Sequence, residues 1–299
     1  MDRLDAMAAF IAVAELQGFA PAARRLRISP SAITRLVAAL EEHLSIRLLQ
    51  RTTRSVTLTD AGTRYLENAR RIVAAVDDAE GAARAERTEP FGRFVVTAPV
   101  VFGRKEVSPL MSEFLRTYPA VTGVLTLADR MVNLVEEGVD LAVRIGVLED
   151  STLRARVVGK TRRLIVGSPA YLDKRRRPRK PSDLERHSII QFTGLNQLPE
   201  WRFSSGREDE RIAFRPTFVT NSADAAIVHA EQGGGLAMVL AYQVADLVQG
   251  GKLEVVLAKF EPPPLPIQLV YPAARLASAN LRTFIELVQK TSRWNFADV

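Results

Sequence analysis

Arginines and small hydroxyl side chains are concentrated near the start of the chain, in a pattern that suits contact with a polyanion. Between Phe19 and Thr59 there are seven arginines against two glutamates, a local net charge of +5. Ser31, Thr34 and Arg35 lie on one face of a predicted helix, and such side chains can contact base edges and phosphates. We therefore predict a DNA-binding surface here. The alternative is a small helical domain whose arginines are only solvated.

A second group of candidate residues follows predicted strands in the C-terminal two hundred residues. Ligands of α/β units bind at the carboxyl ends of strands, and the last three candidates also precede a helix whose amide groups favour an anion. Their mixed apolar and polar character predicts a small organic ligand, with a carboxylate as a candidate group. The alternative is that they are ordinary strand ends. The candidates are Pro99, Val100, Val101, Phe102, Asp129, Arg144, Gly146, Thr220, Asn221 and Ser222.

Most catalytic and metal chemistry lacks its residues in this sequence. There are no cysteines, and the three histidines His43, His187 and His229 are far apart. The chain therefore has no thiolate nucleophile and no cysteine-type zinc site, and no serine nucleophile elbow stands out. We expect no enzyme, no metal site and no cofactor.

The overall charge and hydropathy of the sequence indicate its class of partner and its cellular compartment. The net charge is +7, because 41 basic residues outnumber 34 acidic ones, and this favours anionic partners. An amphipathic helix rather than a signal peptide follows Met1, and no run approaches the roughly 18 apolar residues of a membrane span. We expect a cytoplasmic protein with no membrane partner.

Three short helices are predicted to position the first group of residues. They run from Leu4 to Leu16, from Phe19 to Leu26 and onward from Ser29-Pro30, where serine can cap the helix and proline fits its first turn. This spacing is typical of a helix-turn-helix, whose third helix enters the major groove by its N-terminal end. The apolar face of that helix, at i, i+3, i+4 and i+7, consists of Ile33, Leu36, Val37 and Leu40.

A hairpin is predicted after the third helix. Its strands would run from Leu44 to Leu49 and from Ser55 to Leu58. Arginines and hydroxyl groups at the hairpin tip suit phosphate contact beside the groove. The tip residues are Arg51, Thr52, Thr53 and Arg54.

The N-terminal segment resembles the signature of LysR-type transcriptional regulators. That resemblance implies a winged helix-turn-helix that binds double-stranded promoter DNA, and it adds Ser29 and Leu36 to the predicted contacts. At Leu36 the family commonly carries a base-contacting glutamine, whereas periodicity would bury this leucine. The matching residues are Phe10, Ala14, Gly18-Phe19, Ala22 to Leu26, Ser29 to Ile33, Leu40-Glu41, Arg47 to Leu49, Arg51 to Thr53, Leu58-Thr59 and Ala61-Gly62.

A long helix is predicted from Thr59 to about Thr88, a segment without proline and rich in alanine, arginine and glutamate. Small and apolar residues recur at two heptad positions, which predicts contact with a second helix. The alternative is a helix that packs on its own chain, whereas the family resemblance implies a linker helix that pairs two subunits. The predicted dimer residues are Tyr65, Ala69, Ile72, Val76 and Ala79.

Alternating strand and helix patterns from Arg93 onward predict an α/β domain with mostly parallel sheets. The order resembles the family's effector domain, which has a two-lobed type 2 periplasmic-binding-protein fold. We expect residues 1–58 to form the DNA-binding domain, 59–89 the linker and 90–299 the effector domain. Lobe I would comprise about 90–160 and 266–299, and lobe II about 161–265. An enzyme or solute receptor on this fold is the alternative function.

The resemblance also implies partners. We expect a homodimer or a homotetramer built from two dimers, a small organic effector, and RNA polymerase if the protein is an activator. The run from Lys174 to Lys180 holds six positive charges. Because it lies in a loop of the predicted lobe II, we interpret it as a solvated surface segment rather than a DNA contact.

Overall fold

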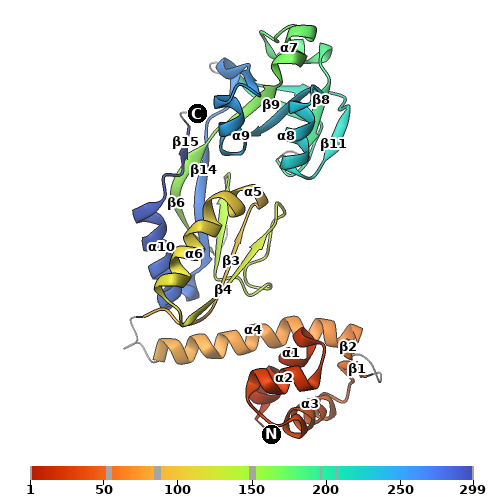
Figure 1. Ribbon diagram of the computed structural model, residues 1–299, viewed down its shortest axis with the longest axis vertical. Coiled ribbons are helices and arrows are strands. Elements are labelled where there is room, and N and C mark those ends of the chain that lie inside the picture. The colour runs from red at the N-terminus through yellow and green to blue at the C-terminus, as the bar shows by residue number, and fades with distance from the viewer. Residues whose placement is uncertain are drawn as a thin grey trace.

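The computed structural model describes residues 2–51, 56–83, 89–147, 153–195, 197–205 and 208–297. A helical domain lies at one end of the molecule, the long helix α4 runs across it, and two lobes that each contain a β-sheet follow (Figure 1). The N-terminus is in the helical domain, whereas the C-terminus lies near the junction of the two lobes.

Local capping signals determine where the first helices begin. The Asp2 Oδ1 atom accepts a hydrogen bond from the Leu4 amide at 2.9 Å, and the Ser29 Oγ atom accepts one from the Ala32 amide at 3.1 Å. Each bond satisfies an amide that has no partner within its helix. The three predicted helices are confirmed as α1 (Arg3–Leu16), α2 (Phe19–Leu26) and α3 (Pro30–Leu44).

The predicted strand from Leu44 to Leu49 is wrong, because α3 continues to Leu44 and the strand begins only at Leu49. Ser45 ends the helix in the left-handed conformation, with φ of 52°. The Glu41 carboxylate then accepts hydrogen bonds from the amides of Leu48 and Leu49 at 2.8 and 2.9 Å, which holds the connecting turn against α3. The antiparallel strands of the hairpin are β1 (Leu49–Arg51) and β2 (Val56–Leu58).

The long helix α4 (Asp60–Ala83) confirms the predicted linker helix as far as Ala83. The predicted remainder, to Thr88, lies outside the described residues. The Thr59 Oγ1 atom accepts a hydrogen bond from the Gly62 amide at 2.9 Å and so caps the first turn.

Lobe I contains a six-stranded sheet in the order β15-β6-β14-β5-β3-β4. Helices α6 and α10 pack against it, and Phe94, Phe114 and Phe284 are completely buried where these helices meet the strands. Its elements are β3 (Gly92–Ala98), α5 (Val100–Phe102), the π-helical turn η1 (Gly103–Val107), α6 (Ser108–Thr117), β4 (Val121–Leu127), β5 (Leu141–Ile145), β6 (Leu153–Thr161), β14 (Leu265–Pro272), the 3₁₀ turn η4 (Ala273–Ala277), α10 (Ala279–Thr291) and β15 (Asn295–Phe296).

Lobe II contains a five-stranded sheet in the order β11-β8-β12-β7-β13 and a separate hairpin of β9 and β10. Its elements are β7 (Arg163–Gly167), α7 (Pro169–Arg175), the 3₁₀ turn η2 (Pro181–Arg186), β8 (Ile189–Phe192), β9 (Glu200–Ser205), β10 (Glu208–Ala213), β11 (Phe218–Thr220), α8 (Ala223–Glu231), β12 (Leu236–Leu240), α9 (Ala241–Gln249), β13 (Glu254–Val256) and the 3₁₀ turn η3 (Ala258–Phe260).

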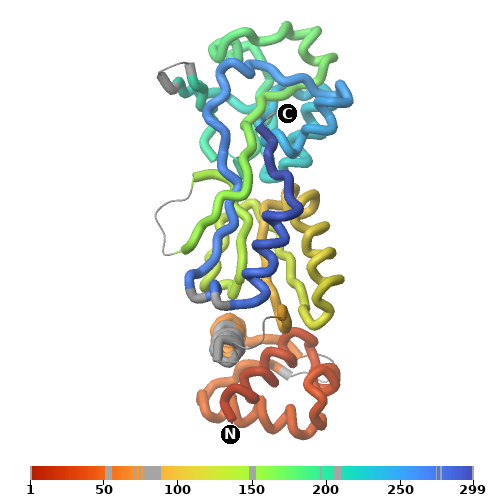
Figure 2. Tube along the Cα trace, turned by 90° about the vertical axis from the view of Figure 1, so that its left-hand side faces the viewer, coloured from red at the N-terminus to blue at the C-terminus, as the bar shows by residue number. Residues whose placement is uncertain are grey.

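Two antiparallel strands, β6 and β14, connect the lobes. They run side by side from one lobe toward the other (Figure 2). Because β14 is antiparallel to both β5 and β6, and β7 is antiparallel to both β12 and β13, the sheets are mixed. Within the described residues the two sheets have five parallel and four antiparallel strand pairings, so the predicted excess of parallel pairs is small.

The sequence pattern also predicts a helix from Met131 to Glu137, which is wrong, because residues 131–133 have no regular structure and residues 134–138 form turns. The Asn133 side-chain oxygen accepts hydrogen bonds from the amides of Val135 and Glu136 at 3.2 and 3.3 Å. Such local side-chain bonds compete with helix formation. Several further elements were not predicted, namely β6, β9, β10, α9 and β13.

Candidate DNA-binding surface and ligand cleft

The N-terminal end of α3 presents hydroxyl and guanidinium groups on the surface of the helical domain. Ser29, Ser31 and Arg35 are exposed, and Thr34 is half-buried. The Ser29 Oγ atom lies 3.0 Å from Ser31 Oγ and caps the helix, while the Thr34 hydroxyl donates to the Pro30 carbonyl at 2.9 Å. Ser31 and Arg35 are therefore the side chains at this end with the most freedom to contact a partner.

The opposite face of α3 builds the domain core, as its periodicity predicts. Ile33, Val37 and Leu40 are buried there together with Phe10 of α1. Leu36 is half-buried and packs against the same cluster. Only part of this side chain is therefore available to DNA, which limits its predicted role as a base contact.

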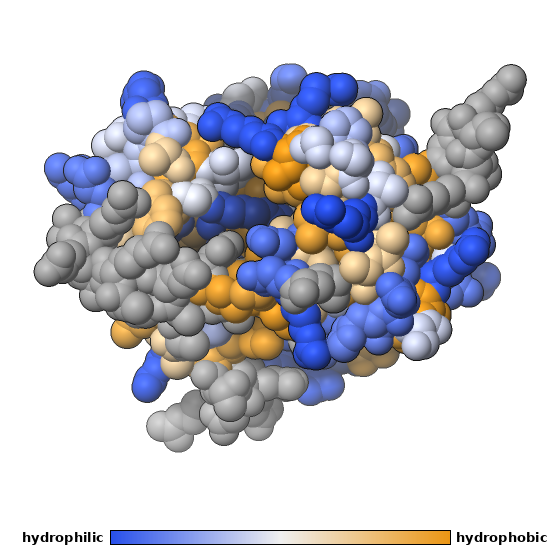
Figure 3. All heavy atoms as spheres, turned by 90° about the horizontal axis from the view of Figure 1, so that it is seen from below, coloured by the Kyte–Doolittle hydropathy of each residue, from blue (hydrophilic) through white to orange (hydrophobic). Residues whose placement is uncertain are grey.

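The end of the molecule that carries α3 is largely hydrophilic on its surface, with apolar residues between the polar ones (Figure 3). Arg24, Arg27 and Arg47 are exposed on the helical domain. Arg25 instead pairs with Glu15 at 2.7 Å. The predicted hairpin-tip contacts Thr52, Thr53 and Arg54, and the side chain of Arg51, lie outside the described residues.

The first half of α4 packs on its own chain, which corrects the predicted dimer seam. The Tyr65 ring contacts the Phe10 ring edge-on at a centroid distance of 5.6 Å. Ala69 is completely buried, and the neighbouring Arg70 pairs with Glu15 of α1 at 2.9 Å. Ala69 is therefore enclosed by its own chain, whereas the half-buried Tyr65 packs on α1 and keeps part of its side chain at the surface.

The second half of the predicted seam has a different environment. Ile72 is 43% exposed and Val76 is half-buried, so both remain available to a partner helix. The side chain of Ala79 lies outside the described residues.

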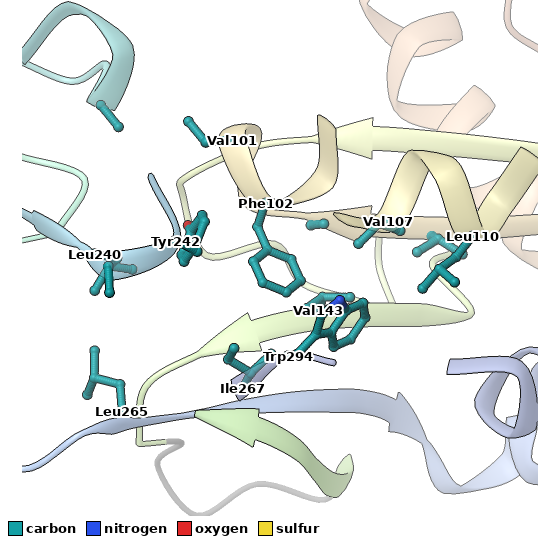
Figure 4. Close-up of a cluster of buried hydrophobic side chains, with 14 of the residues drawn as sticks. Val101, Phe102, Val107, Leu110, Val143, Leu240, Tyr242, Leu265, Ile267 and Trp294 are labelled. Carbon is teal, nitrogen blue, oxygen red and sulfur yellow. The ribbon is translucent and has the colours of Figure 1, made fainter. Parts of the chain in front are cut away.

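In lobe I, some of the predicted ligand-binding side chains are buried in the apolar core, whereas others remain partly exposed. Phe102 is completely buried, and its ring centroid lies 5.0 Å from that of Tyr242 and 4.9 Å from that of Trp294 (Figure 4). Val101 is also buried in this cluster. These two side chains join the lobes through apolar contact, which corrects their assignment as ligand contacts. Pro99 and Val100 remain half-buried.

Asp129 caps the N-terminal end of the short helix α5. Its Oδ1 atom accepts a hydrogen bond from the Val100 amide at 3.0 Å. Burial and the nearby Asp224 carboxylate raise the pKa of Asp129, while the bond from Val100 opposes this shift. Asp129 thus both orients the loop after β3 and carries charge near the junction of the lobes.

Arg144 lies at the end of β5 and is held by the loop that follows β4. Its guanidinium donates to the Val132 carbonyl at 2.6 Å and contacts the Met131 sulfur at 2.9 Å. Burial lowers the pKa of Arg144. Nearby, the Gly146 carbonyl accepts a hydrogen bond from the Gln268 side chain at 2.8 Å, and Gly146 has a positive φ of 123°.

In lobe II, the polar residues before α8 largely bond to one another. The Thr220 hydroxyl accepts a hydrogen bond from the Ser222 amide at 3.1 Å, and Ser222 Oγ accepts one from the Ala225 amide at 3.3 Å. Asn221 is exposed. Because Ser222 caps α8 and Asp224 lies in its first turn, the positive end of this helix is already partly compensated.

Two ion pairs across the lobes were not predicted. Arg104 contacts Asp224 at 3.3 Å, and Lys105 contacts Asp246 at 2.8 Å. Both cations belong to the π-helical turn η1, a distortion that often occurs at functional sites. Gly103 begins this turn, and a Cβ atom there would lie 2.1 Å from the Leu127 side chain. In the sequence, Gly103 is the signal that this turn and the Leu127 side chain of β4 lie close together.

Two protein families match this chain. Bacterial regulatory helix-turn-helix proteins of the lysR family match residues 4–63, and the LysR substrate binding domain matches residues 87–293. The chain belongs to the LysR family. LysR-type proteins are DNA-binding transcriptional regulators with a substrate-binding domain for an effector, so the resemblance seen in the sequence and the fold class are confirmed.

Relatives along nearly the whole chain are similar to this LysR-type protein. An uncharacterized HTH-type transcriptional regulator of Haemophilus influenzae is 32% identical over 92% of this chain and 96% of its own. An HTH-type transcriptional repressor of Pseudomonas aeruginosa is 31% identical over 97% of this chain and 92% of its own. The solved structure of CrgA, a LysR-type regulator from Neisseria meningitidis, has 30% identity and a TM-score of 0.61, covering 96% of this chain and 98% of that one.

Within the described ranges, no helix combines the length and apolar character that a bilayer crossing requires. Those same ranges contain no group of three or more His, Cys, Asp or Glu side chains arranged to hold a metal ion.

Proposed function

We propose that this LysR-type protein reads promoter DNA with the N-terminal end of α3. The observation that carries the proposal is the exposure of Ser31 and Arg35 on the face of α3 that does not enter the domain core. An arginine there can donate two hydrogen bonds to a guanine in the major groove, and a serine hydroxyl can bond to a base or a phosphate. The hairpin of β1 and β2 lies beside this helix and would contact the sugar–phosphate backbone.

The same proposal includes a small-molecule effector that binds between the lobes. Pro99, Val100, Asp129, Arg144 and Gly146 would contribute from lobe I. Thr220, Asn221 and Ser222 would contribute from lobe II. A carboxylate on the effector is supported by Arg144, although its present bonds to the loop after β4 would have to rearrange. Binding would favour one degree of lobe closure and so change how the DNA-binding domains are spaced.

We further propose that the protein acts as a homodimer, or as a homotetramer built from two dimers, in the cytoplasm, and that it regulates transcription rather than catalysing a reaction. The distal half of α4, with Ile72 and Val76, would form the subunit contact. An activator of this kind would also contact RNA polymerase. The support is the regulator function of the relatives together with the exposed apolar side chains on α4.

A fluorescence anisotropy titration with labelled DNA from the gene's own upstream region tests the DNA-binding part. We expect Arg35→Ala to weaken binding to the specific site at least tenfold while leaving binding to scrambled DNA nearly unchanged. Arg116→Ala provides a matched control, because Arg116 is exposed on α6 in lobe I. Equal affinities of Arg35→Ala and the parent for the specific site would contradict the proposal.

A further inference from the structure

A pocket in lobe II contains an excess of positive charge. It lies where the β9–β10 hairpin meets the strands β7 and β12, and it has a volume of about 240 Å³. None of the residues assigned above to the effector cleft lines it. The lining residues of this lobe II pocket are Arg163, Leu195, Glu200, Arg202, Arg211 and Met238.

The hairpin places two of these arginines directly opposite each other. Arg202 of β9 pairs with Arg211 of β10 in the antiparallel register. On the other face of β9, Trp201 and Phe203 are buried in the apolar core of lobe II. Like charges opposite one another on one face of a hairpin destabilise it unless something compensates them. The Glu200 carboxylate contacts Arg211 at 3.2 Å and supplies part of that compensation.

Arg163 brings a third guanidinium to the pocket from the start of β7. Its side chain is half-buried, and within the described residues no carboxylate or other acceptor bonds to its guanidinium. Burial and the nearby Arg202 both lower the pKa of Arg163. A partly desolvated guanidinium without a bonded acceptor among the described residues is costly, and a bound anion would reduce that cost.

The remaining lining is apolar, which indicates the kind of anion. Met238 is buried on β12 and Leu195 is half-buried after β8, so both present hydrocarbon surface to the pocket. Arginine pairs with planar carboxylates through two parallel hydrogen bonds. A carboxylate attached to a small apolar body therefore matches this lining better than an inorganic anion does.

We propose that the lobe II pocket is a second small-molecule site, which binds a small organic acid through Arg163 and Arg202. This goes beyond an effector held between the lobes, because the two sites share no residue. The pocket also lies next to the crossover between the lobes, since Arg162 directly follows β6 and its carbonyl accepts a hydrogen bond from the Ala241 amide at 3.0 Å. An occupant would therefore contact the start of lobe II beside the hinge.

Isothermal titration calorimetry of the full-length protein tests this site, with acetate, succinate and benzoate as acid probes. Benzamide serves as the neutral match for benzoate, and inorganic phosphate as the anion without an apolar body. We expect at least one acid to bind, with benzoate tighter than benzamide. Arg163→Gln should raise the Kd of that acid at least tenfold, and Arg202→Gln should raise it to a lesser extent. Arg215→Gln is the matched control, because Arg215 is exposed in lobe II outside the pocket lining.

Arg144→Gln separates this site from the effector cleft. If acid binding persists in Arg144→Gln and is lost in Arg163→Gln, the lobe II pocket is the site, whatever the outcome for the effector cleft. The proposal is overturned if none of the three acids binds to the parent, if phosphate alone binds, or if only Arg144→Gln loses binding. Circular dichroism shows whether Arg163→Gln folds. If it does not, Arg202→Gln decides the question, because the Arg202 side chain is exposed. An acid Kd in Arg202→Gln equal to that of the parent would then overturn the proposal.

Discussion

Arg104 of lobe I lies 3.3 Å from Asp224 of lobe II, and this ion pair joins the lobes together with that of Lys105 and Asp246, beside a buried aromatic cluster. The two side chains are 58% and 55% exposed, so solvent screens their attraction and the pair contributes little to folding. Asp224 also acts on Asp129, whose pKa is raised mainly by burial and in addition by the Asp224 carboxylate.

We therefore predict that Asp224→Asn lowers the pKa of Asp129, because it removes a nearby negative charge while burial of Asp129 is unchanged. Carbon-13 NMR titration of the aspartate carboxyl groups measures this shift. Asp246→Asn removes the second ion pair but leaves the Asp224 carboxylate in place, and it therefore serves as a control. An Asp129 pKa that is the same in Asp224→Asn and the parent contradicts the prediction.

Phe102 is predicted to hold the lobes together through burial rather than through ligand contact. Phe102→Ala removes a completely buried ring from a cluster with Tyr242 and Trp294. Truncations of this kind lower the free energy of unfolding by about 3–5 kcal/mol. Urea denaturation measures the loss. Val147→Ala, at a side chain that is 87% exposed, should change stability by less than about 0.5 kcal/mol, and equal effects of the two variants would refute the packing role.

Asp140 is predicted to make the protein less stable as the pH rises from about 4 to about 6. Burial raises the pKa of Asp140 from 3.8 to about 6, although its carboxylate accepts a 2.7 Å hydrogen bond from the Val95 amide. Between these two values the folded protein binds more protons at Asp140 than the unfolded chain does. The free energy of unfolding therefore falls as pH rises through this window, and the loss is complete above it.

The size of that fall is at most about 3 kcal/mol, and the contact between Arg275 and Asp140 at 3.2 Å reduces it. Chemical denaturation at several pH values measures the slope. Asp140→Asn should make the slope shallower without removing it, because burial also raises the pKa of Asp129. Asp183→Asn is not a suitable control, because hydrogen bonds lower the pKa of Asp183. Lys105 likewise lowers the pKa of the exposed Asp246. The free energy of unfolding that Asp246 contributes should therefore decrease as the pH falls, which is opposite to the effect of Asp140. An unchanged slope in Asp140→Asn contradicts the assignment.

The revised subunit contact gives a fourth prediction. Ile72→Asp and Val76→Asp should each weaken dimerisation, because they place a charge in the proposed apolar seam of α4. Sedimentation velocity across a range of protein concentrations measures the effect. Ala69→Asp should instead unfold the helical domain, since Ala69 is completely buried within its own chain. Dimers of normal strength in both Ile72→Asp and Val76→Asp would exclude this seam.

The elements that follow from local signals were predictable from the sequence, whereas those that depend on distant contacts were not. Ser29-Pro30 marks the start of α3, and Phe19 to Leu26 form the predicted helix α2 without any shift of boundary. By contrast, the partner of Tyr65 lies in α1, more than fifty residues away, so heptad spacing alone could not distinguish it from a second subunit.

The same limit applies to the junction of the lobes. The periodicity around Phe102 gives no indication of the π-helical turn that follows it, and the pairing of Arg104 with Asp224 joins residues 120 positions apart. Positions at strand ends do not by themselves distinguish side chains that face solvent from those that fill the core, as the burial of Phe102 and the exposure of Asn221 illustrate.

Guanine N7 accessibility in the operator most directly tests the central claim that α3 reads the major groove through Arg35. Because N7 lies in the major groove, dimethyl sulfate footprinting of parent and Arg35→Ala complexes, each at saturating protein, reports the contact itself. We predict protected guanines about one helical turn or a multiple apart, with at least one in each half-site losing its protection in Arg35→Ala. Identical protection patterns for the two proteins would contradict the account.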